Sequence, residues 1–259
     1  MRIDRANARR AFDAYVAAYD GTDPKIRLKA DHTYRVADLC ERISRSLPLP
    51  EDDVDLAWLC GLLHDIGRFE QVRRFGTFKD AESVSHAALG AQILFGEGGI
   101  IRRLAADSGQ DALVRAAVAE HSDYRLPSDQ DERTRTFCDI VRDADKIDIV
   151  KVNCVEPVQA IYDVSEAELA ASSVSPQALA GFAEHRTLRR GERVYPADYV
   201  VGHICFAFEL AYSESRRLMR QQGYLDQMLS RPFSNAQTAE AFARMRAEMR
   251  AWLDARERG

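Results

Sequence analysis

The residues best suited to chemistry are His64 and Asp65, which follow the almost wholly apolar run LAWLCGLL at positions 56–63. A helix that is apolar on all sides is buried. A buried carboxylate is costly unless a cation compensates it, and no Lys or Arg precedes Asp65 within one helical turn. A metal ion is the natural partner, and we expect Gly67 to let the chain turn so that both side chains face one cavity. The alternative is an ordinary surface-exposed pair at a helix end.

Three further histidines, His32, His86 and His121, stand where other helices could supply ligands. His121 follows the apolar run LVRAAVAE at positions 113–120, and AALG follows His86. A single histidine in such a position is more often a hydrogen-bonded or surface residue than a ligand. The joint pattern of all three with the pair at 64–65 is what favours a metal site.

A second apolar segment, IVRDADKIDIV at positions 140–150, is interrupted by three aspartates. Asp145 and Asp148 are three residues apart and share one face of a helix, whereas Asp143 points elsewhere. We expect one of the three to turn inward, and spacing alone leaves open which one.

Apolar residues recur at helical spacing along nearly the whole chain, and alternating strand patterns with tight turns are absent. The sequence therefore predicts an all-α fold. The expected helices are 5–19, 25–46, 52–66, 83–95, 98–107, 110–121, 131–150, 197–222 and 235–256. A Ser/Ala/Glu-rich stretch near 155–175 predicts a catalytic domain over residues 1–155 and, over residues 156–259, a C-terminal helical extension that packs on it.

Composition narrows the classes of function. The net charge of −5 argues against a nucleic-acid partner, because no global positive field is available. Five scattered cysteines without a CxxC pair predict reduced thiols. No segment approaches the roughly 20 apolar residues of a membrane span, so we expect a cytoplasmic protein without a membrane partner. The basic amphipathic stretch at 241–252 predicts a surface helix, with a homodimer contact as the alternative.

The order His32, His64-Asp65, His86, His121 and Asp145 resembles the HD-domain superfamily of metal-dependent phosphohydrolases, in its six-ligand, two-metal branch. The resemblance covers roughly residues 25–150. The run LLHDIG at 62–67 matches closely, as does ADK at 144–146, which carries the ligand role to Asp145 and not to Asp143. The fold it implies is an HD-domain helical bundle.

Departures from the family pattern narrow the branch. His121 is followed by SDYRLP, without the second histidine or Gly-Tyr-Pro of the cyclic-di-GMP phosphodiesterases. Positions 66–68 read IGR in place of the acidic pair of the guanosine-tetraphosphate hydrolases. The run GRFEQVRRFGTFK at 67–79 looks like a little-characterised bacterial HD group.

The resemblance implies two divalent transition-metal ions, with iron or manganese expected first and nickel, cobalt or zinc as alternatives, since imidazole and carboxylate ligands suit these metals. Asp65 would bridge the metals. His32, His64 and Asp145 would complete one site, and His86 and His121 the other.

A metal-bridging hydroxide would then hydrolyse a phosphate ester or anhydride of a small molecule, with nucleotides among the candidate substrates. Arg68 and Lys146, each beside a ligand in sequence, are the expected phosphate contacts. Two other uses of the site stay open: a mixed-valent di-iron oxygenase, and a non-catalytic sensor stabilised by metal.

Overall fold

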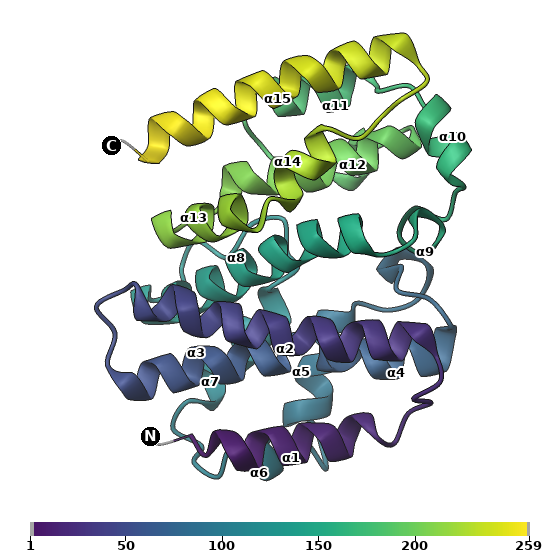
Figure 1. Ribbon diagram of the computed structural model, residues 1–259. Helices are drawn as coiled ribbons and strands as arrows, with labels where there is room; N and C mark the ends of the chain where they lie inside the picture. The colour runs from purple at the N-terminus through teal and green to yellow at the C-terminus, as the bar shows by residue number, and fades with distance from the viewer. Residues whose placement is uncertain (1–2, 258–259) are drawn as a thin grey trace. The chain divides into compact units, whose positions relative to one another are not determined.

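The computed structural model describes residues 3–257, and this part of the chain is helical and contains no strand, which confirms the all-α prediction (Figure 1). The chain divides into two compact units, Met1–Asp145 and Lys146–Gly259. None of the described helices is both long enough and apolar enough to cross a membrane.

The N-terminal unit is a bundle in which α2 packs along α3, α4 along α5, and α5 along α7. Its elements are α1 (Arg5–Val16), α2 (Pro24–Arg45), α3 (Glu51–Leu63), α4 (Ile66–Phe75), the 3₁₀ turn η1 (Asp80–Glu82), α5 (His86–Phe95), α6 (Ile101–Leu104), α7 (Asp111–Glu120) and the first part of α8 (Glu132–Val155).

Helix α3 is the buried centre of this unit. Acidic residues fill its first turn, where a helix dipole favours negative charge. Every residue from Leu56 to Leu63 is buried, and Trp58 is fully so. Burying a large apolar side chain stabilises a fold by about 2 kcal/mol, so this run fixes the helix that leads to His64.

Helix α2 begins at Pro24, where Asp23 accepts a hydrogen bond from the amide of Lys25 (2.8 Å). Its buried face includes His32, Thr33 and Val36, at helical spacing. The same face that packs on α3 therefore carries His32 inward.

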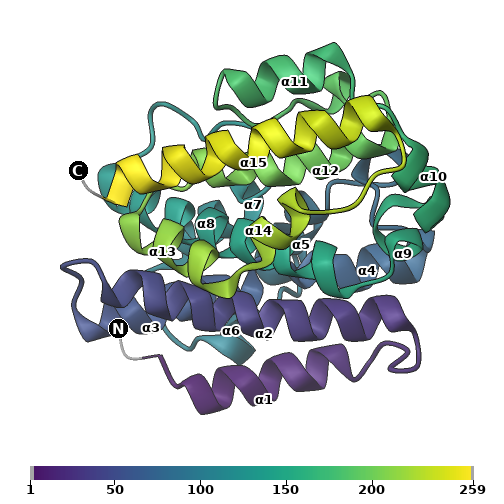
Figure 2. The ribbon, with the colours of Figure 1, turned by 45° about the horizontal axis from the view of Figure 1, so that its top comes forward.

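The C-terminal unit contains the rest of α8 and several short helices. They are α9 (Val158–Tyr162), α10 (Glu166–Ala171), α11 (Pro176–Ala183), η2 (Arg190–Glu192), α12 (Pro196–Ile204), η3 (Cys205–Glu209), α13 (Ser213–Gln222), α14 (Tyr224–Leu229) and α15 (Ala236–Glu257). Helix α15 packs against α13 and α14 (Figure 2). Aromatic pairs such as Phe208–Trp252, whose ring centroids are 5.0 Å apart, pack within the C-terminal unit.

Two element predictions were wrong. The single helix expected over 197–222 is broken into α12, η3 and α13, although no Pro or Gly stands at 205–212. Phe208 in the broken stretch packs on Phe182, His185 and Trp252, so tertiary packing outweighs the continuous apolar period. Residues 67–75, expected to lie between helices, belong to α4.

Candidate metal centre

His64 and Asp65 form the corner between α3 and α4. His64 caps the C-terminus of α3, and Asp65, with φ −103° and ψ 15°, leaves the helical conformation before α4 begins at Ile66. Both side chains are buried. The prediction that Gly67 makes the turn was wrong, because Gly67 is the second residue of α4 and the turn lies at Asp65 itself.

The six predicted ligands come from separate elements and lie together. His32 is in α2, His86 is the first residue of α5, His121 caps the C-terminus of α7, and Asp145 is in α8. Ligand atoms within 4.8 Å of one another form three groups that could hold a metal ion: His32, His64 and Asp65; His64, His121 and Asp145; and Asp65, His86 and His121.

The histidines are arranged as two pairs on either side of Asp65. The Nε2 atoms of His32 and His64 are 3.3 Å apart, and each lies 3.5 Å from Oδ2 of Asp65. The Nε2 atoms of His86 and His121 are 3.0 Å apart and lie 3.4 and 3.7 Å from Oδ1 of Asp65. Each oxygen of one carboxylate therefore faces its own pair of imidazoles.

Asp145 joins the first pair, with Oδ1 3.1 Å from Nε2 of His32 and 3.7 Å from Nε2 of His64. The three aspartates at positions 143, 145 and 148 therefore differ in position, since neither Asp143 nor Asp148 belongs to any of the groups that could hold a metal among the described residues.

Hydrogen bonds determine which imidazole nitrogen carries the proton in His64, His86 and His121. Nδ1 of His64 donates to the carbonyl of Gly61 (2.7 Å), and Nδ1 of His121 donates to the carbonyl of Val118 (2.8 Å). A carbonyl only accepts, so Nδ1 carries the proton and Nε2 presents a lone pair to the centre. Nδ1 of His86 lies 2.8 Å from Oδ2 of Asp80, which sets the same tautomer.

This donor set fits a metal ion. The lone pairs of His86 and His121 face each other at 3.0 Å with no proton between them, so a cation is needed to hold this pair together. Two nitrogen ligands about 2.1 Å from one metal, at angles between octahedral and tetrahedral, lie about 3.0–3.4 Å apart. Both histidine pairs match that spacing.

The charges at the site also suit a metal. Burial lowers the pKa of His64, and it lowers that of His86 to about 4, so both imidazoles are neutral and able to coordinate. Burial alone would raise the pKa of Asp65, but the ammonium of Lys29 beside it holds that pKa well below its ordinary value. Against the effect of burial, the hydrogen bond from His32 holds the pKa of Asp145 well below its ordinary value too. The carboxylates are ionised.

A model of the HD-domain family matches residues 30–150. The chain contains an HD domain. The match includes all six predicted ligands, and HD proteins are in general metal-dependent phosphohydrolases that bind divalent metals. Comparison with curated proteins and with solved structures finds no match to the chain.

Lys29, one residue before the matched region, is a contact of Asp65 that the sequence did not predict. Its Nζ lies 2.5 Å from Oδ2 of Asp65, on the side of His32 and His64. The ammonium also lies 5.5 Å from the ring centroid of Phe78. Lys29 precedes His32 by three residues, so helical spacing was the signal that could have found it.

Arg68 is close to the other oxygen of Asp65, with Nε 3.5 Å from Oδ1. Its Nη1 donates to the carbonyl of Phe78 (2.6 Å) and to Asp80 (3.0 Å), whereas its buried Nε makes no hydrogen bond to any described residue. Asp80 thereby connects Arg68 to His86. It was also missed, because nothing in its sequence context distinguishes it from a surface acid.

Lys146, the other predicted phosphate contact, belongs to the C-terminal unit. Its Nζ lies 3.3 Å from Oε2 of Glu209, and both side chains are largely buried. Its charge is therefore compensated by a carboxylate within its own unit.

Proposed function

We propose that this HD protein is a phosphohydrolase that cleaves a phosphate ester or anhydride of a small molecule and uses two divalent metal ions. The observation that carries the proposal is the pairing of four histidines about the two oxygens of Asp65. A carboxylate in that position suits a bridge between two metals better than a ligand to one. His32, His64 and Asp145 would hold one ion, and His86 and His121 the other.

Iron or manganese fits the nitrogen and oxygen ligands best, with nickel, cobalt and zinc as alternatives. When bound, such ions supply Lewis acidity and an activated water for attack at phosphorus. The residues of the chain hold the ions, keep the imidazoles neutral and position the substrate phosphate.

Arg68 is the proposed phosphate contact. Its Nε–H is buried beside Asp65 without a hydrogen-bond acceptor, and a substrate phosphate would supply one. Asp80 and the carbonyl of Phe78 hold Nη1, so the guanidinium is oriented before the substrate binds. Lys146 is a second proposed contact, which would have to exchange Glu209 for the phosphate.

We also propose that residues 1–155 are the catalytic domain and that residues 156–259 form an extension that shapes substrate choice. The substrate is proposed to be a small phosphate compound, with nucleotides included. A cytoplasmic location is part of the same proposal.

The test begins with metal analysis of the natively purified chain. It continues with a panel of nucleotides and other phosphoesters, assayed without oxygen after reconstitution with manganese or iron. We expect hydrolysis that disappears in Asp65→Asn together with bound metal. Arg68→Gln should keep its metal and lose about 100-fold in kcat/KM. The matched control is His185→Gln, because His185 is an exposed histidine of the C-terminal unit that pairs with Glu248.

Two results would contradict the proposal. Iron-dependent consumption of oxygen without hydrolysis would assign the centre to an oxygenase. Full metal loading without turnover of any compound on the panel would assign it to a metal-stabilised sensor.

A further inference from the structure

Arg193, between η2 and α12 in the C-terminal unit, has a guanidinium with unused hydrogen-bond donors. Its Nε is buried and makes no hydrogen bond, and Nη2 makes only a long bond of 3.4 Å to the carbonyl of Leu188. Among the described residues no carboxylate forms an ion pair with it. The guanidinium also lies over the ring of Tyr199, with Cζ 5.6 Å from the ring centroid. Burial lowers the pKa of Arg193, in keeping with an uncompensated charge.

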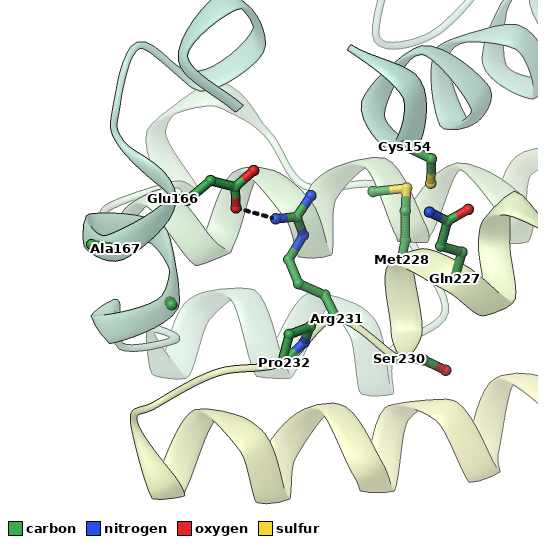
Figure 3. Close-up of a pocket in the computed structure, with 9 residues that line it drawn as sticks. Cys154, Glu166, Ala167, Gln227, Met228, Ser230, Arg231 and Pro232 are labelled. Atoms are coloured by element: carbon green, nitrogen blue, oxygen red, sulfur yellow. Dashed lines mark hydrogen bonds and ion pairs between the residues drawn. The ribbon is translucent and has the colours of Figure 1, made fainter. Parts of the chain in front are cut away.

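Other arginines of the same unit have carboxylate partners. Arg186 makes a two-point contact with Glu192 (2.8 and 2.9 Å). Arg231 lines a pocket of about 560 Å³ and pairs with Glu166 at 3.1 Å (Figure 3). Since removing most of a guanidinium from water without a carboxylate partner is costly, Arg193 is an exception that needs an explanation.

The backbone of α12 leaves room for this side chain. A Cβ built on Gly202 would lie 2.9 Å from Nε of Arg193 and 3.1 Å from both Cζ and Nη2. Any other residue at this position would push the guanidinium away. Because Gly202 has no side chain, the guanidinium of Arg193 can pack directly against α12.

A chain of hydrogen bonds near Arg193 leads from Asn153 through Tyr162 to His203. Asn153 donates through Nδ2 to the carbonyl of Ile149 (2.7 Å), so its Oδ1 accepts the short hydrogen bond from the hydroxyl of Tyr162. The Tyr162 oxygen then faces Nδ1 of His203 at 3.5 Å. Burial, with the charge of Arg193, lowers the pKa of His203 to about 3, so this imidazole is neutral and provides no competing cation.

We propose that Arg193 anchors an oxyanion-binding site in the C-terminal unit, for a carboxylate or phosphate group of a small molecule. A planar guanidinium with free N–H groups binds either group through two parallel hydrogen bonds. Arg193 and His203 both keep part of their surface exposed, so a small ligand can reach them. The site is separate from the proposed hydrolase activity and requires no metal.

The test measures binding of inorganic phosphate and of acetate to the full chain by calorimetry, at constant ionic strength. We expect saturable binding of at least one of them, before and after removal of metal. Arg193→Gln should weaken the metal-independent binding by about tenfold or more. The anion that binds more tightly identifies the group, phosphate or carboxylate.

Gly202→Ala is a second variant that leaves Arg193 in the chain. Alanine favours the helix, but its Cβ should displace the guanidinium and weaken binding as well. Arg231→Gln is the matched control, because the charge of Arg231 is already paired, and it should bind as the wild type does. Circular dichroism of each variant verifies the fold.

Three results would overturn the proposal. They are no saturable binding of either anion to the wild-type chain, unchanged metal-independent binding in Arg193→Gln, and an equal loss in Arg231→Gln, which would indicate general charge attraction.

Discussion

At the scale of single residues, the site is governed by how Asp65 is compensated. The carboxylate is buried, and Lys29 lies 2.5 Å from one of its oxygens. Lys29→Met should lower the free energy of unfolding of the metal-free chain by about 3 kcal/mol, because it leaves a buried charge without its closest cation. The loss should be smaller in the metal-loaded chain, where the metal compensates Asp65. Urea unfolding with and without metal measures both values.

Lys25→Met is the matched control for this prediction. Lys25 lies on the same helix, but it is exposed and its Nζ donates to the carbonyl of Gly76 (2.5 Å). Lys25→Met should lower the free energy of unfolding much less than Lys29→Met does, both with and without metal. Equal destabilisation of Lys29→Met with and without metal would show that the metal does not take over the role of the ammonium.

Asp80 acts on the metal through His86. Its carboxylate accepts from Nδ1 of His86 and from Arg68, so Asp80→Asn should loosen the ring and reduce its basicity. We expect metal affinity to fall by about 10- to 100-fold, as for other partners of ligating histidines. Titration of the metal-free chain with manganese measures it. Glu82→Gln, an exposed acid in the same 3₁₀ turn, should bind normally; an equal affinity in both variants would rule out the role of Asp80.

Some residues of the site could be predicted from the sequence and others could not. His86 and His121 could be proposed as ligands because, together with His32 and the pair His64-Asp65, they form one joint pattern that indicates a metal site. Asp80 could not, because Asp is abundant on surfaces, and Lys29 was marked only by its helical spacing from His32. Their importance comes from contacts between segments remote in sequence, such as the one between α2 and the corner at Asp65.

At the scale of elements, α4 and α5 must approach each other closely for His86 to reach Asp65. A Cβ on Gly67 would lie 2.1 Å from the carbonyl oxygen of His86 and 2.6 Å from the amide of Gly90. These are backbone atoms that cannot rotate away. Gly67→Ala should therefore separate the helices and destabilise the chain by about 3 kcal/mol or more.

The same substitution should weaken metal binding, because it moves the first residue of α5. Thermal unfolding and metal titration measure the two effects. Gly21→Ala is the control, since a Cβ there meets nothing within 4 Å. If Gly67→Ala keeps wild-type stability, the close approach of the two helices does not constrain this position.

Element prediction succeeded where the hydrophobic period agrees with burial, as in α2, and where a continuous apolar run is buried on all sides, as in α3. It failed over 197–222, where the period continues but the backbone turns at Cys205–Glu209 to seat Phe208 among aromatic side chains. Local sequence carries no information on that distant partner. Gly67 shows a related limit. The sequence marked this glycine as important for a turn, but the structure requires it because α4 and α5 pack closely there.

At the scale of the whole molecule, the ligands span His32 to Asp145, so the complete metal set exists only when the N-terminal unit is folded. Metal binding should therefore stabilise that unit against unfolding. Each unit also contains histidines in the neutral form, His64 and His86 in the first unit and His203 in the second.

Those histidines predict how stability depends on pH. The pKa of His86 is lowered from 6.5 to about 4 and that of His203 to about 3, chiefly by burial, and that of His64 is lowered as well. The unfolded chain therefore binds more protons than the folded one below pH 6.5. The free energy of unfolding of the metal-free chain should fall as the pH falls from about 6.5 to about 4, by up to about 1.4 kcal/mol per pH unit for each histidine.

Asp65 and Asp145 do not account for this window, because the ordinary pKa of an aspartate is 3.8 and their lowered values lie below it. Glutamates such as Glu70, whose pKa is lowered from 4.5, add to the slope only at the acid end of the window. Urea unfolding at several pH values measures the slope, and His203→Phe should reduce it by one histidine's share. An unchanged slope in that variant would show that His203 accepts a proton in the folded chain, which would require a nearby acid or water to stabilise an imidazolium beside Arg193.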